Sequence, residues 1–154
     1  MNRSILLSVV ALVALSGCES TERGGGAMHA MSEKTVVVSV VDGVITVPQD
    51  PVNLFASNGV IKWVFDSNPS GYVFPQDGIK FEANPTPPPA SLGCSTYPDP
   101  ATIFTNCKPK QGGTEFQCNK TGPHVVDACF KYDVKVEPIG GGKAIVLDPW
   151  ARLK

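Results

Sequence analysis

Apolar and polar positions alternate with a period of two over several short stretches of this chain, the pattern expected of half-buried strands. Residues 61–66 place Ile, Trp and Phe on one face. Residues 130–137 place Phe, Tyr and two Val on one face, and Lys, Asp, Lys and Glu on the other. Further strands are expected, from apolar content between turn signals, at 35–41, 44–47, 52–55, 72–74, 79–82, 115–118 and 144–147.

Turn residues separate these strands and argue against helices. Asp42-Gly43 is a hairpin signal, and the chain has 14 prolines and 15 glycines. No stretch of a dozen residues has the apolar repeat of an amphipathic helix without a Pro or a Gly. The sequence therefore predicts one all-β domain, a sandwich or barrel, over residues 35–154, a length sufficient to bury its own core.

One interval breaks the rhythm of short strands. Residues 83–113 contain seven prolines and two cysteines, with at best one short strand near residues 102–105. A connection of this length is uncommon in a compact domain unless it is functional or held by crosslinks. We expect a stiff loop that disulfides attach to the domain.

The first residues have the layout of an export signal. Arg3 precedes an apolar run over residues 5–15, which is too short to cross a bilayer, since a spanning helix needs about 20 apolar residues. Leu15-Ser16-Gly17-Cys18 follows and resembles the lipobox of bacterial lipoproteins. The resemblance implies that residues 1–17 are removed and that Cys18 is lipidated and anchors the chain to a membrane. Glu19 after it, by resemblance to enterobacterial sorting, favours the outer membrane and a domain that faces the periplasm.

Residues 18–34 are predicted to be the lipidated Cys and a flexible linker, because they are polar, rich in Gly and without apolar periodicity. Met28, His29 and Met31 within the linker are residue types that bind soft copper, although an incidental occurrence in a linker is favoured. Without residues 1–17 the chain has 12 Lys and Arg against 14 Asp and Glu, since Arg3 is lost. No basic block points to nucleic acid.

The stretches 71–81 (GYVFPQDGIKF) and 115–136, with an aromatic-x-Cys strand, a loop holding His124 and an alternating Val strand, resemble the cupredoxins. The resemblance implies a Greek-key β-sandwich in which one hairpin loop, from Cys118 to the strand at residue 129, holds copper ligands. It places the first copper His at Gln76, the Cys at Cys118, the second His at His124 and the axial Met at Phe130. The implied ligand set is therefore incomplete, and the expected cofactor is none.

The alternative is a periplasmic copper-binding or electron-transfer protein. It would use Cys118 and His124, with His29, Met28 and Met31 from the linker. The remaining four cysteines argue against it, because an even number in an oxidising compartment predicts two disulfides. A sulfur locked in a disulfide is not available as a thiolate ligand.

Three pairings of these four cysteines are open. Strand parity puts Cys118 on the core face, with Phe116, and Cys129 on the outer face, with Lys131. Parity therefore favours Cys94–Cys118 with Cys107–Cys129 over the local pairing Cys94–Cys107 with Cys118–Cys129.

Catalysis is not expected. The domain has one histidine, His124, and the sequence lacks Gly-x-Ser-x-Gly, His-Glu-x-x-His, Cys-x-x-Cys and a phosphate-binding Gly loop. The predicted role is binding or structural, at the bacterial cell envelope, with an envelope protein as the partner. The expected binding face is the crosslinked loop region around Gln76, Tyr97, Phe104 and His124.

Overall fold

The computed structural model describes residues 32–66, 71–83, 85, 87 and 90–154. The predicted signal segment, Cys18, and Met28, His29 and Met31 of the predicted linker lie outside the described residues. Among the described residues, no helix is long and apolar enough to cross a membrane. All but three of the regular elements in this part of the chain are strands, so the prediction of an all-β domain is confirmed.

The first sheet has five strands within the described part of the chain, in the order β2-β1-β4-β8-β7. Strands β1 and β4 run parallel, and the other neighbours are antiparallel. The strands of this sheet are β1 (Ser32–Val41), β2 (Val44–Thr46), β4 (Asn58–Phe65), β7 (Phe104–Lys110) and β8 (Glu115–Lys120).

The second sheet is built around β9 (Cys129–Pro138). On one side of β9 lie β10 (Ile145–Leu147) and β11 (Trp150–Leu153), and β3 (Val52–Leu54) pairs in parallel with β11. On the other side lie β5 (Tyr72–Val73) and β6 (Ile79–Phe81). Three short 3-10 turns, η1 (Ala90–Leu92), η2 (Pro100–Thr102) and η3 (Gln111–Gly113), complete the described elements.

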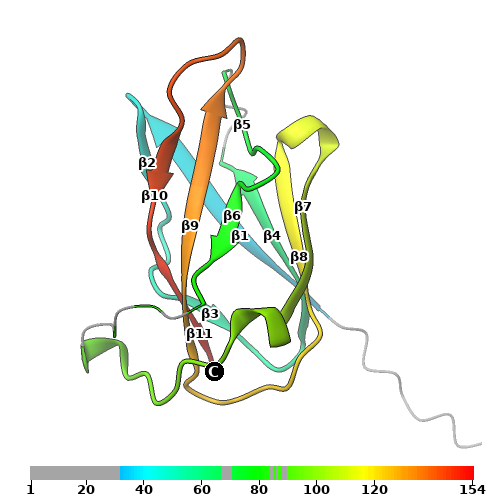
Figure 1. Ribbon diagram of the computed structural model, residues 1–154, viewed down its shortest axis with the longest axis vertical. Helices are drawn as coiled ribbons and strands as arrows, with labels where there is room; N and C mark the ends of the chain where they lie inside the picture. The colour runs from blue at the N-terminus through cyan, green and yellow to red at the C-terminus, as the bar shows by residue number, and fades with distance from the viewer. Residues whose placement is uncertain (1–31, 67–70, 84, 86, 88–89) are drawn as a thin grey trace, which may run out of the picture.

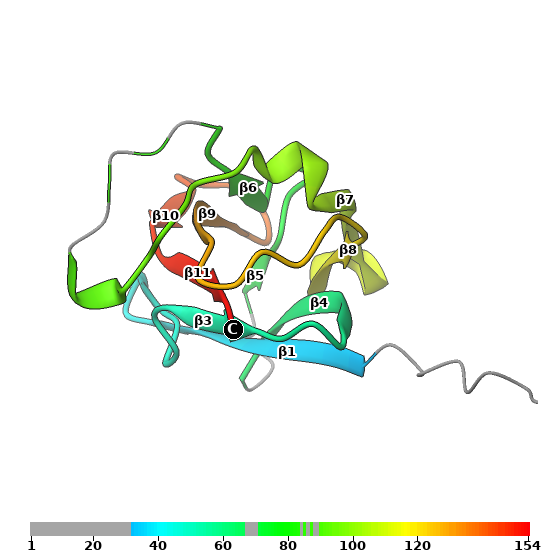
Figure 2. The ribbon, with the colours of Figure 1, turned by 90° about the horizontal axis from the view of Figure 1, so that it is seen from below.

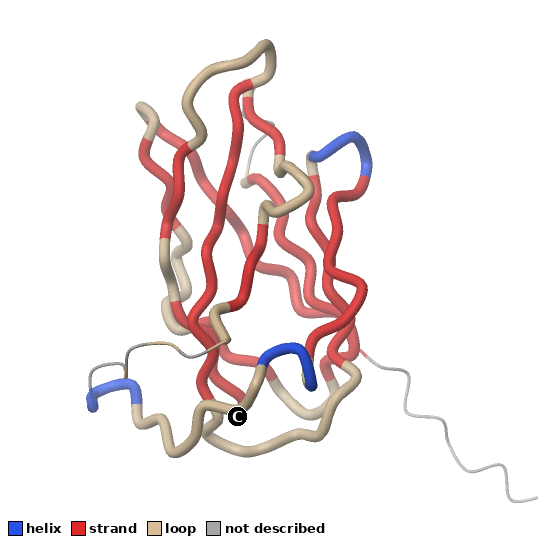
Figure 3. The backbone as a smooth tube through the Cα atoms, in the orientation of Figure 1, coloured by secondary structure: helices blue, strands red, loops and turns tan. Residues whose placement is uncertain are grey.

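The two sheets pack as a β-sandwich, with the long strands running lengthwise and the loops gathered at the two ends (Figure 1, Figure 3). The alternation predicted for residues 130–137 is confirmed, because every second side chain from Phe130 to Val136 is buried. Aromatic rings join the sheets in the core. The Trp63 ring of β4 meets the Tyr132 ring of β9 edge-on, with 5.8 Å between centroids.

The ends of the sandwich differ. One end, which we call the hairpin end, carries the Asp42-Gly43 turn between β1 and β2 and the turn between β9 and β10. The other end, which we call the loop end, carries the β3–β4 turn (residues 55–57), the β8–β9 loop (residues 121–128) and much of the segment from residue 90 to η2. Figure 2 looks at the loop end and shows the β8–β9 loop, in gold, running across it.

The predicted hairpin around His124 is wrong. Strand β8 belongs to the first sheet and β9 to the second, so the β8–β9 loop crosses between sheets and joins strands that do not pair. Two strands also differ from the prediction. The strand expected near residues 102–105 is the longer β7, which continues through Pro109, and β11 was not predicted.

Candidate functional site

The loop end is held together by backbone hydrogen bonds between segments far apart in the sequence. Asp127 N donates to Leu153 O over 2.9 Å, and Lys154 N donates to Leu54 O over 2.8 Å. These bonds place the β8–β9 loop, the residue after β11 and the end of β3 side by side. The apolar residues Leu54 and Leu153 are buried beneath them. Backbone hydrogen bonds therefore hold the loops of the loop end in place over the core.

The Pro-rich segment is attached to this surface by a disulfide. Cys94 and Cys129 are bonded, across 35 positions of sequence. Ser95 N donates to Asp127 O and Cys129 N donates to Thr96 O, so the backbone on both sides of the disulfide is also fixed.

Arg152 ties a further part of the same segment to β11. Its guanidinium donates to Asp127 Oδ1 and, through Nη1, to the backbone oxygen of Leu92 at 2.6 Å. The arginine is half-buried, so this ion pair is shielded from water better than a surface pair.

The second disulfide joins Cys107 and Cys118 across the neighbouring strands β7 and β8. All four cysteines of the domain therefore form disulfides, as predicted, but the predicted pairs Cys94–Cys118 and Cys107–Cys129 are wrong. The observed pairing is the third connectivity, which parity did not favour.

A bulge in β7 explains the pairing of Cys107 with Cys118. Thr105 pairs with Asn119 and Lys108 with Gln117, so two residues of β7 lie opposite Cys118 alone. Asn106 adopts a positive φ of 52°, a conformation that Asn tolerates better than most residues. The extra residue brings Cys107, and not Asn106, across from Cys118.

The two copper ligands expected in the β8–β9 region are both engaged. Cys118 is fully buried and its sulfur is bonded to Cys107. The His124 Nε2 atom lies 2.8 Å from the backbone oxygen of Lys154. In the tautomer with the proton on Nε2, the ring donates a hydrogen bond to this oxygen. The His124 Nδ1 atom is buried and makes no hydrogen bond to the described residues. Within the described part of the chain, Cys118 and His124 therefore do not fit a thiolate–imidazole copper site.

The predicted binding face around Gln76 is also wrong in part. Gln76 lies in the β5–β6 connection, where Gly78 O accepts from Lys135 N. Lys135 is six residues along β9 from Cys129, roughly 20 Å of strand. His124 lies beyond the other end of that strand, so Gln76 and His124 are not brought together.

Phe104 lines a pocket together with Phe81, Ala83 and the η2 residues Pro100 and Ala101. It is buried, and its ring stacks on Phe81 with 4.1 Å between centroids. Tyr97 is exposed and lies at the loop end, next to Thr96, so Tyr97 and His124 are the two expected residues that this surface presents.

The apolar part of the loop end was not predicted from the sequence. Phe55 follows β3, and Val125 and Val126 follow His124 in the β8–β9 loop. All three are exposed, as is Tyr97. The backbone bonds of Lys154 and Asp127 bring the segment of Phe55 and the segment of Val125 and Val126 side by side. The Val125-Val126 pair, two apolar residues in a loop between strands, was the available sequence signal.

One lysine at the loop end is buried. Lys120, the last residue of β8, follows the inward parity of Phe116 and Cys118 and is only 5% exposed. Its amine has no hydrogen bond or ion pair with any described residue. Burial lowers the pKa of Lys120.

We predict that Lys120→Met stabilises the domain. Methionine keeps a long side chain where the stem of Lys120 is buried, and it removes an amine whose charged form burial disfavours. Thermal unfolding at pH 7 should show a higher melting temperature for Lys120→Met. Burial disfavours the charged amine in the folded state, and this cost disappears once the amine of the folded protein loses its proton. The gain in melting temperature should therefore shrink as the pH rises toward the pKa of the unfolded chain, near 10. A lower melting temperature would mean that the amine has a stabilising partner.

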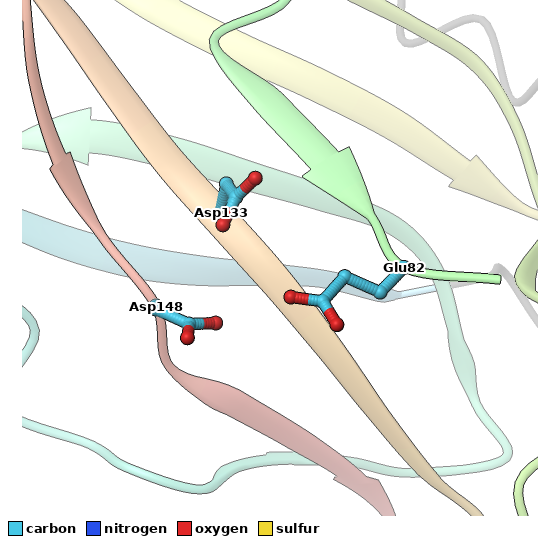
Figure 4. A group of neighbouring side chains, drawn as sticks. All are labelled: Glu82, Asp133 and Asp148. Carbon is cyan, nitrogen blue, oxygen red and sulfur yellow. The ribbon is translucent and has the colours of Figure 1, made fainter. Parts of the chain in front are cut away.

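A second group of polar side chains lies on the outer face of the second sheet (Figure 4). Glu82, Asp133 and Asp148 each offer a carboxylate oxygen within 4.8 Å of the others. The amine of Lys131 lies 2.6 Å from Asp148 Oδ2 and 3.6 Å from Glu82 Oε1. Hydrogen bonding to Asp148 raises the pKa of Lys131. Since Lys131 already supplies a cation to this cluster, we interpret the cluster as a surface ion-pair network.

Comparison with known proteins adds no assignment: no family model matches this chain, and no curated protein matches it.

Proposed function

We propose that this chain is a lipid-anchored module of the bacterial cell envelope, with a binding or structural role. In this proposal Cys18 is the lipidated first residue of the mature chain, residues 18–34 are the tether, and the domain faces the periplasm from the outer membrane. The lipobox-like segment Leu15-Ser16-Gly17-Cys18 supports the anchor. Two packed mixed sheets support a cupredoxin-like sandwich. The disulfide of Cys118 supports the proposal that this sandwich has no copper site.

One observation carries the binding role. The exposed apolar residues at the loop end sit on loops that a disulfide, an ion pair and backbone bonds hold in place, so this surface is costly to present to water and pre-organised for contact. Tyr97 adds an aromatic ring with a polar tip, a residue type favoured in binding surfaces.

A catalytic role has little support from the groups at this surface. A base beside a nucleophile would have to come from His124, and its Nε2 is engaged with Lys154 O while Nδ1 is buried. Asp127, the carboxylate nearest to His124 in sequence, is bound by Arg152 instead. We therefore propose a module without catalysis.

The copper alternative is tested by counting free thiols in the purified, unreduced protein and then titrating it with Cu(I) and Cu(II). We expect no free thiol in residues 35–154 and no stoichiometric copper, because both disulfides involve the sulfurs that a copper site would need. An intense blue Cu(II)–thiolate band, with Cys118 reduced, would replace this proposal by the copper-binding one.

A further inference from the structure

The loop end exposes apolar side chains from two loops that are separate in sequence. Val126 is 59% exposed and Phe55 is 52% exposed. Both loops are braced: Asn58 Oδ1 accepts from Phe55 N at 2.8 Å, and Ser95 N donates to Asp127 O at 2.9 Å. These side chains are therefore presented by fixed backbone, and burying them requires little ordering of the loops.

The chain also enters the sandwich at this end. Ser32, the first described residue, donates from its backbone N to Ser57 O in the same β3–β4 turn that carries Phe55. Figure 1 shows β1 beginning at this end. Cys18 lies 14 residues before Ser32, and a chain of 14 residues spans at most about 50 Å even when fully extended. A lipid on Cys18 would keep the loop end within that distance of a membrane.

Charge at the loop end does not oppose contact with an anionic lipid surface. Asp127 is paired with Arg152, and the Asp99 carboxylate accepts from Ala101 N at the start of η2. Lys120 lies buried at the same end. Lys154 adds an exposed amine at this end, so the side chains of these five residues carry no excess of negative charge. The carboxylates of Glu82, Asp133 and Asp148 lie on the outer face of the second sheet, where the Lys131 amine pairs with Asp148 and Glu82.

We infer that the loop end docks on the bilayer that holds the lipid of Cys18, with Phe55, Val125 and Val126 inserted at the interface. This inference rests on the proposed lipid anchor. The hairpin end also exposes apolar side chains, from Val41, Val44 and Ile139, but only the loop end lies beside the point where the chain leads back toward Cys18. That proximity favours the lipid surface for the loop end. The docked domain would stand upright, with the hairpin end farthest from the membrane.

Tryptophan substitution at the two ends tests the docking. The full-length protein is expressed, purified from membranes after acylation, and reconstituted into phosphatidylethanolamine–phosphatidylglycerol vesicles with and without brominated lipid, which quenches nearby indole emission. Val126→Trp reports on the loop end. Val44→Trp is the matched control at the hairpin end, because Val44 is 60% exposed and Val126 is 59% exposed. The parent protein provides the baseline from Trp63 and Trp150.

We expect the emission added by Val126→Trp to be blue-shifted and to lose most of its intensity with brominated lipid, while the emission added by Val44→Trp keeps its intensity. Equal quenching at both positions, or none at Val126, would overturn the docking. A blue shift at Val126 without quenching would overturn it too, since the cover would then be protein: a second copy, a partner or the chain's own first residues. Incorporation of a fatty-acid label is scored in the same preparations, and its absence would refute the anchor itself.

Discussion

Replacing Cys94 and Cys129 together by alanine is expected to lower the free energy of unfolding by about 4 kcal/mol, the loop-closure value for a separation of 35 residues. For a domain of this size that corresponds to a fall in melting temperature of about 15 °C. The effect is large because the segment between η1 and η2 has few other ties to the second sheet. Those ties are Arg152 to Leu92 O, the backbone bonds of Ser95 and Thr96, and the bond from Ser95 Oγ to Val126 O.

The matched control is the double variant Cys107→Ala, Cys118→Ala. Its disulfide spans 11 positions between strands that the β7–β8 ladder already pairs, so the expected loss is about 3 kcal/mol at most from loop closure. Denaturant unfolding of both variants, followed by circular dichroism, gives the two free energies. A loss for the control that equals or exceeds the loss for Cys94–Cys129 would contradict this ranking of the two crosslinks.

The second large effect is expected in the core, where Tyr132→Ala should cost about 3–5 kcal/mol. Tyr132 is fully buried in β9, and its ring contacts Trp63 of the facing sheet and Phe81 of β6. Truncation would remove contacts that join the two sheets and leave a cavity between them. Denaturant unfolding measures the loss. A cost below about 1 kcal/mol would mean that the core collapses around the cavity or that the sheets are held mainly elsewhere.

Tyr132→Phe is the conservative comparison and also isolates a pH effect. Burial raises the pKa of the Tyr132 hydroxyl, and the neighbouring Trp63 lowers it by a smaller amount. A raised pKa means that the folded state holds the proton more tightly, so this stability is present below the unfolded value near 10 and is lost as the pH rises above it. The stability of the parent should therefore fall more steeply above pH 10 than that of Tyr132→Phe. Parallel pH profiles of stability for the parent and Tyr132→Phe would contradict a raised pKa for Tyr132.

The strands with strict alternation could be predicted from the sequence. The stretch 130–137 forms a central strand whose inner residues all enter the core, and 61–65 forms part of β4. Strand β7 was underestimated because Pro109 interrupts its pattern. An edge strand tolerates proline since its outer N–H groups have no ladder partner, and β7 is the edge of the first sheet.

Strand β11 was missed for a different reason. Trp150 follows Pro149, and a proline at this point indicates that the chain has left the sheet. Asp50 accepts a hydrogen bond from Trp150 N, and β3 pairs with β11 in parallel. Strand β11 is held by these long-range contacts and has only four residues, so no local sequence pattern predicts it.

The candidate site was harder to predict than the fold because it depends on which loops meet. The alternation of side chains correctly placed Cys118 in the core, but it placed Cys129 on the outer face with Lys131. Cys129 is 1% exposed because the segment around Cys94 covers the start of β9. The β7 bulge, which brings Cys107 opposite Cys118, has no signature in the residue pattern.

Metabolic labelling with a fatty-acid analogue tests most directly whether this chain is a lipid-anchored module. We expect the label on the parent protein and its complete loss in Cys18→Ala, since lipidation at that sulfur is what the Leu15-Ser16-Gly17-Cys18 segment implies. Cys94→Ala, Cys129→Ala is the control for a general effect of cysteine replacement and should retain the label. Labelling that survives Cys18→Ala, or a parent protein that takes up no label, would contradict the proposed anchor.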